Sequence, residues 1–100
     1  MKYRISEKAF EDIKNIWLYT VETWSAAEQA DRYYNLIFDE IEHLAGHPAA
    51  GRCYDHIRKG YRCARVKSHL IFYRLGNPDE IIEIIRVLHQ SMNTEERLNE

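Results

Sequence analysis

A long aliphatic run near the carboxyl end, residues 80–92 with the sequence EIIEIIRVLHQSM, constrains the fold more than any other stretch. Its apolar side chains are Ile81, Ile82, Ile84, Ile85, Val87 and Leu88. Both alternating faces of an extended backbone are therefore apolar, and β-branched residues favour a pleated strand over a helix. We predict a central strand that is covered on both faces.

Two titratable side chains, Arg86 and His89, interrupt this apolar strand. An unpaired guanidinium is strongly disfavoured in a protein interior, so Arg86 must either reach solvent or be paired. We expect Arg86 to lie at a functional surface with Arg62 or His89 nearby, so that alanine in its place would leave stability nearly unchanged. A solvated strand end without a function is the alternative interpretation.

The first half of the chain predicts a short strand followed by two long helices. Residues 2–5 alternate polar and apolar, and Ser6 is suited to cap a helix over residues 6–23. The apolar stripe of this helix recurs at three- and four-residue steps and comprises Phe10, Ile13, Trp17, Thr20 and Trp24. Ser25 and Glu28 have the spacing of a capping box and predict the start of a second helix. Its stripe comprises Ala30, Tyr33, Tyr34, Ile37, Ile41 and Leu44.

Two amphipathic helices joined by so short a turn must fold back as an antiparallel hairpin. Gly46 and Pro48 end the second helix. After a turn-rich loop, residues 61–67 and 69–75 have the pattern of two strands, and residues 76–79 that of the turn before the last strand. We therefore predict an α+β fold of order β-α-α-β-β-β, with the two-helix hairpin packed on a small, mainly antiparallel sheet. A last helical turn is expected from Thr94.

Length and composition favour one domain spanning residues 1–100, because 100 residues with 45% hydrophobic content bury a single core. The amino-terminal segment is charged and no apolar run is long enough for a signal peptide or a membrane span, so we expect a cytoplasmic protein. Cys53 and Cys63 lack metal-ligand spacing and suit reduced thiols. The glycines are scattered and form no nucleotide-binding loop, so no cofactor is expected.

Charge is strongly segregated along the chain. Net charges are −4 for residues 1–50, +6 for residues 51–74 and −4 for residues 75–100. The cationic segment contains Arg52, Arg58, Lys59, Arg62, Arg65, Lys67 and Arg74. It suits an acidic partner, whereas the overall pI of about 6.2 argues against a domain held mainly by phosphate contacts.

Three site hypotheses follow from residue types. His43 and His47 lie one helical turn apart, but no third ligand is indicated, so no metal site is expected. The aromatic residues near Trp17 and Trp24 suit either core packing, which we favour, or a platform for unpaired bases. A metal-independent ribonuclease needs an acid or base together with cations near the phosphate. Candidates for such a site are Arg62, Arg65, Lys67, His69, Arg74, Arg86 and His89.

The ordered set of segments resembles the ParE branch of the RelE/ParE toxin superfamily, and the resemblance covers nearly the whole chain. Shared features are YRIS with Ala9 and Asp12, IWLYT, Trp24 with the pair Gln29-Ala30, LAGHPAAGR, IRKGYR, SHLIFYR and IIRVLHQSM. The predicted hairpin over an antiparallel sheet is also similar to the fold of that superfamily. Ser91 and Asn93 depart from the family pattern, which often has a basic residue and Asp at these positions.

The resemblance implies a toxin of a type II toxin–antitoxin system, encoded as a stability module, that acts on DNA gyrase and is held inactive by a ParD-type antitoxin. RelE-like relatives instead cut messenger RNA in the ribosome, which is the alternative activity. The segment RVLHQSM resembles the ParE ending and lacks the tyrosine that ribosome-dependent relatives often carry there. We therefore expect a non-enzymatic gyrase inhibitor in a toxin–antitoxin hetero-oligomer.

Two contact surfaces are predicted from these considerations. The surface for the target comprises Arg62, Arg65, His69, Arg74, Arg86 and His89. The antitoxin is expected on the outer surface of the helix hairpin, from which an acidic tail runs toward the cationic segment. Residues expected to contact the antitoxin are Trp17, Tyr34, Arg58 and Lys59.

Overall fold

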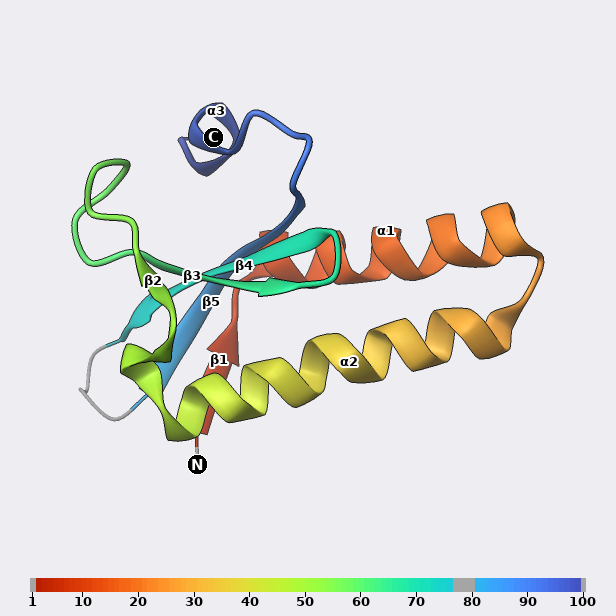
Figure 1. The fold of residues 1–100 in the computed structure, drawn as a ribbon, viewed down its shortest axis with the longest axis horizontal. Helices are drawn as coiled ribbons and strands as arrows, with labels where there is room; N and C mark the ends of the chain where they lie inside the picture. Colours follow the sequence, from red (N-terminus) through yellow and green to blue (C-terminus); the bar gives the residue numbers. More distant parts are fainter. Residues whose placement is uncertain (1, 77–80, 100) are drawn as a thin grey trace.

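Two antiparallel helices pack on one face of a five-stranded sheet in the computed structural model, which describes residues 2–76 and 81–99 (Figure 1). In chain order the elements are β1 (Lys2–Ile5), α1 (Glu7–Trp24), α2 (Ala27–Gly46), the short 3-10 helix η1 (Pro48–Ala50), β2 (Arg52–Cys53), β3 (Arg62–Val66), β4 (His69–Leu75), β5 (Ile81–His89) and α3 (Thr94–Leu98). The predicted α+β fold is confirmed, with β2 and η1 as additions. None of the helices in the described ranges is long and apolar enough to cross a membrane.

The strand order is β1-β5-β4-β3-β2, so β5 is an interior strand with a hydrogen-bonded neighbour on each side. It pairs in parallel with β1 and antiparallel with β4, and β3, β4 and β5 form the predicted meander. The middle position in the sheet belongs to β4. Most of the turn predicted before β5, residues 77–79, lies outside the described residues.

A β-bulge changes the phase of β5. Phe72 is opposite Arg86 and Tyr73 is opposite Ile84, which leaves Ile85 as the extra residue on β5. Consequently Val87, and not Arg86, joins Ile84 in the core beneath the helices. Strict alternation, on which the prediction for this strand rested, therefore ends at the bulge.

The second face of the sheet is also covered, as predicted. The residues buried there are Tyr61, Cys63, Phe72, Leu88 and Leu98, with Tyr54 and Ile57 packed against them. They come from the strands, from the loop before β3 and from α3. Burial raises the pKa of the Cys63 thiol to about 11, and Cys53 on the neighbouring strand is a free, exposed cysteine.

The helix hairpin extends beyond the sheet at its turn end (Figure 1). Ala9 and Ile13 of α1 are buried on the sheet, whereas Phe10 is 58% exposed and Trp24, near the turn, is 63% exposed. The prediction that Phe10 and Trp24 face the core is therefore wrong. A helical period sets the spacing of a stripe but not how far along the helix its partner reaches.

The two helix starts have different origins. Ser6 is the predicted cap of α1, and its side chain accepts a hydrogen bond from the backbone N–H of Ala9 at 3.0 Å. Ser25 instead ends α1 in the left-handed conformation, with φ of 51°, and α2 begins at Ala27 without a side-chain cap. The predicted capping box of Ser25 and Glu28 is wrong, because the tight turn uses Ser25 to reverse the chain.

Candidate functional site

The edge of β5 beyond β1 is completed by side chains of the chain that follows β1. β1 ends at Ile5, so the backbone of residues 85–87 has no neighbouring strand on that side. The Ser6 hydroxyl donates to the carbonyl of Ile85 at 2.8 Å, and a carboxylate oxygen of Asp12 accepts the backbone N–H of Val87 at 3.0 Å. These two side chains supply the hydrogen bonds that another strand residue would otherwise make.

The Arg86 guanidinium forms a two-pronged ion pair with the same carboxylate. Nε lies 2.8 Å from one oxygen of Asp12 and Nη2 lies 3.0 Å from the other, while Nη1 donates to the carbonyl of Arg97 at 3.1 Å. Arg86 is only 8% exposed. The expectation of a solvent-facing Arg86 next to Arg62 or His89 is therefore corrected, because its charge is satisfied by α1 and the C-terminal tail.

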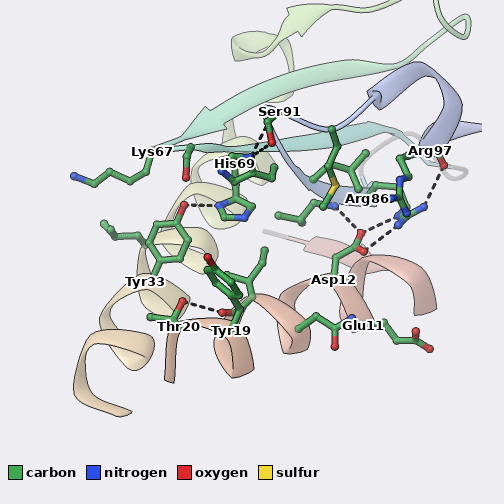
Figure 2. A pocket seen from close by; sticks show the side chains of 18 of the residues that line it. Glu11, Asp12, Tyr19, Thr20, Tyr33, Lys67, His69, Arg86, Ser91 and Arg97 are labelled. Carbon is green, nitrogen blue, oxygen red and sulfur yellow. Dashed lines mark hydrogen bonds and ion pairs between the residues drawn. The ribbon is translucent and has the colours of Figure 1, made fainter. Parts of the chain in front are cut away.

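A groove of about 1310 Å³ lies beside this ion pair, between the helix hairpin, the β3–β4 turn, β5 and the C-terminal segment (Figure 2). Several exposed apolar side chains line it, among them Tyr19 (69% exposed), Trp24, Leu36 and Met92. Among its described lining residues, five are basic and two are acidic. The basic ones are Lys8, Arg32, Lys67, Arg86 and Arg97, and the acidic ones are Glu11 and Asp12. The groove is thus apolar with a surplus of positive charge.

Two predicted residues, His69 and His89, meet in the lining of this groove. They are direct partners across β4 and β5, with ring centroids 5.2 Å apart and ring planes at 89°. Nδ1 of His69 lies 2.6 Å from the Tyr33 hydroxyl, as Figure 2 shows, and Nδ1 of His89 lies 2.7 Å from the Ser91 hydroxyl. The strand register therefore brings together residues that are twenty positions apart in the chain.

Burial lowers the pKa of His69 to about 4, and the neighbouring His89 contributes in the same direction. An unfolded histidine binds its proton near pH 6.5, so the folded state is favoured most above that pH and loses stability as the pH falls toward 4. We expect the thermal midpoint to fall over this interval by a few degrees more in the parent chain than in His69→Asn. Midpoints measured at half-unit pH steps would check this.

The exposed His56 provides the matched control for this pH dependence, since His56→Asn should retain the slope of the parent chain. An unchanged slope in His69→Asn would show that another group is responsible for the loss of stability.

The four remaining or partly separated target candidates do not converge on the histidine pair. Arg62 is opposite Tyr73, at the other end of the β3–β4 hairpin from His69. Its Nη2 donates to the carbonyl of Ala49 at 3.2 Å, and its buried Nε has no partner among the described residues. Arg62 therefore ties η1 to the sheet.

Arg65 and Arg74 are exposed and are held by near neighbours. Nε of Arg65 donates to the carbonyl of Lys67 at 2.7 Å, and Arg74 forms an ion pair with Glu83 at 3.0 Å. Of the six residues predicted for target contact, the structure thus places His69, Arg86 and His89 on the groove and Arg62, Arg65 and Arg74 elsewhere.

The residues predicted for antitoxin contact also separate. Trp17 is half-buried and its indole N–H donates to Asp31 at 2.9 Å, while Tyr34 is partly exposed and packs on Phe38 with ring centroids 4.7 Å apart. Neither belongs to the described residues that line the groove. Arg58 and Lys59 are exposed in the loop before β3, where Arg58 donates to the Asn99 side chain at 3.2 Å.

Sequence reasoning missed Tyr19, Trp24, Leu36 and Met92 as groove residues. Apolar periodicity assigned Trp24 to the core, and the exposure of these side chains arises because the hairpin extends beyond the sheet. Within residues 2–76 and 81–99, no three His, Cys, Asp or Glu side chains are grouped so that they could hold a metal ion.

A hairpin of two helices on a five-stranded mixed sheet defines the RelE/ParE class of toxin folds. The structure is similar to a chain from "Chromosomal ParDE TA system from P. aeruginosa", with a TM-score of 0.74, 20% identity and coverage of 89% of this chain and 95% of that chain. It is also similar to a chain of the toxin–antitoxin complex RelBE2 from Mycobacterium tuberculosis, with a TM-score of 0.61, 18% identity and coverage of 88% and 95%. These likenesses establish the fold.

Sequence comparison identifies the family within this class. The family model described as "ParE toxin of type II toxin-antitoxin system, parDE" matches residues 3–94. The chain is 42% identical over 96 residues to Toxin ParE1 of Caulobacter vibrioides, covering 96% of each chain, and 35% identical over 97 residues to Toxin ParE1 of Mycobacterium tuberculosis, covering 97% of each. The chain belongs to the ParE toxin family of type II toxin–antitoxin systems.

Proposed function

We propose that this ParE toxin inhibits DNA gyrase by binding, without an enzymatic step, and is neutralised in the cytoplasm by a ParD-type antitoxin. Family membership over residues 3–94 supports the toxin class. The observation that carries the non-enzymatic part is the separation of the cationic candidates from the histidine pair. Arg62 lies at the far end of the hairpin, and Arg86 is engaged with Asp12.

A ribosome-dependent ribonuclease would need the opposite arrangement. Its proton donor and its cations must surround one phosphate, because charge develops there in the transition state. His69, with a pKa lowered to about 4, is neutral near pH 7 and is a poor proton donor there. The geometry therefore supports the use of this surface for binding.

The groove has the chemistry expected for an amphipathic segment of an antitoxin. Exposed Tyr19, Trp24 and Leu36 offer apolar contacts to one face of a helix. Basic residues outnumber acidic ones in the lining, which favours an acidic segment. The two structurally similar proteins are toxin–antitoxin systems by their printed descriptions, which supports a hetero-oligomer here. Exposed Arg58 and Lys59 remain the proposed contacts for an acidic tail.

Two assays run side by side test this function. The purified chain should block supercoiling of relaxed plasmid by purified gyrase at concentrations that leave cell-free translation unaffected. Addition of the cognate antitoxin, the protein encoded beside this chain, should restore supercoiling. Arrest of translation with unimpaired supercoiling would assign the chain to the ribonuclease alternative and overturn the proposal.

A further inference from the structure

The hydrogen-bond partners of His69 fix the position of its ring proton. The Tyr33 hydroxyl has one proton, and it donates to the carbonyl of Val66 at 3.2 Å. Its second contact, 2.6 Å from Nδ1 of His69, is a hydrogen bond only when Nδ1 carries the proton. In the neutral ring the lone pair is then on Nε2. His69 therefore offers a hydrogen-bond acceptor at Nε2.

His89 has the opposite arrangement. The backbone N–H of Ser91 donates to Nδ1 of His89 at 3.1 Å, and a backbone N–H is only a donor. Nδ1 must therefore carry a lone pair, and the neutral ring holds its proton on Nε2. His89 thus offers a hydrogen-bond donor at Nε2, where His69 offers an acceptor.

The register of β4 and β5 places this donor and this acceptor side by side in the groove. His69 and His89 are paired residues, and both line the groove. Among the described residues no hydrogen bond joins the two rings, and neither Nε2 has a partner. A bound molecule is therefore free to use both atoms.

We propose that His69 and His89 select a partner segment that places a carboxamide side chain, Asn or Gln, against them. A carboxamide has an N–H donor for His69 and a carbonyl acceptor for His89. A carboxylate has only acceptors and would oppose the lone pair of His69, whereas an ammonium has only donors and would oppose the N–H of His89. This inference rests on the proposed function, in which an antitoxin segment occupies the groove.

Tyr33→Phe tests the role of the fixed proton. Removing the hydroxyl releases His69 from a single tautomer, so affinity for the cognate antitoxin, measured by titration calorimetry, should fall about tenfold, the effect of one imperfect buried hydrogen bond. Tyr34→Phe removes a hydroxyl from the next residue of α2, outside the described groove lining, and should bind like the parent chain. Equal affinities for the two variants would overturn the inference.

Replacing each Asn by Asp and each Gln by Glu in the antitoxin tests the other side of the contact. One replacement should weaken binding to the parent toxin about tenfold or more and weaken binding to Tyr33→Phe distinctly less, because the two changes disrupt one contact. A series in which no replacement shows this coupling would overturn the inference. A failure of the parent toxin to bind the antitoxin at all would overturn the proposed function as well.

Ring-nitrogen NMR of the unmodified toxin tests the same inference independently of any variant. The ¹⁵N shifts should assign the proton to Nδ1 in His69 and to Nε2 in His89 at neutral pH. The same tautomer in both rings would overturn the donor–acceptor pair. A single-stranded oligonucleotide that displaces the antitoxin, and binds Tyr33→Phe more weakly than the parent, would assign the pair to nucleic-acid bases and overturn the choice of a carboxamide partner.

Discussion

Arg86→Ala is expected to lower the free energy of unfolding by about 3–5 kcal/mol, because removing one member of a buried ion pair leaves the other charge uncompensated. The Asp12 carboxylate is mostly buried and would keep only its bond from the N–H of Val87. The carbonyl of Arg97 would also lose the bond that it accepts from Nη1 of Arg86. This result is the opposite of what the sequence pattern led us to expect.

Arg74→Ala is the matched control for Arg86→Ala, since Arg74 pairs with Glu83 at the surface and about half of its side chain is exposed. Exposed ion pairs contribute only about 0–1 kcal/mol. Urea unfolding of the three proteins, monitored by circular dichroism, gives both differences on one scale. If Arg86→Ala proved no more destabilising than Arg74→Ala, Arg86 would be available for the target surface.

Gly51→Ala is expected to lower the free energy of unfolding by about 2–5 kcal/mol, combining overpacking of roughly 1–3 with a disturbed buried hydrogen bond of roughly 1–3. An added Cβ would overlap the hydroxyl of Tyr73 and would lie 2.7 Å from its Cε1. Tyr73 is fully buried, accepts the N–H of Gly51 at 2.8 Å and donates to the carbonyl of Pro48 at 2.7 Å. The ring cannot retreat without losing both bonds.

Gly60→Ala separates this steric effect from backbone strain. Gly60 has a φ of +88° and open space around the position of a Cβ, so alanine there should destabilise by about 1 kcal/mol through its conformation alone. Scanning calorimetry should therefore show a fall of roughly 10 °C or more for Gly51→Ala and a smaller fall for Gly60→Ala. Similar midpoints for Gly51→Ala and the parent chain would mean that the segment of η1 moves away from Tyr73 at little cost.

Local sequence patterns determined the secondary elements of this protein and their order. The apolar run of residues 81–88 identified β5, because a strand buried on both faces has no polar side. Three- and four-residue spacing identified α1 and α2, and Ser6 marked the first helix start. These features depend on neighbours within a few residues, so a single sequence contains them.

The tertiary structure decided which of these residues form the site. Arg86 meets Asp12 across 74 positions of sequence because β1 ends before β5 does, and the bulge at Ile85 changes the phase of the strand only through its pairing with β4. His69 and His89 come together through strand register, and Trp24 becomes exposed because the hairpin extends past the sheet. Register, bulges and the reach of a helix arise from pairings between distant segments, and no local spacing records them.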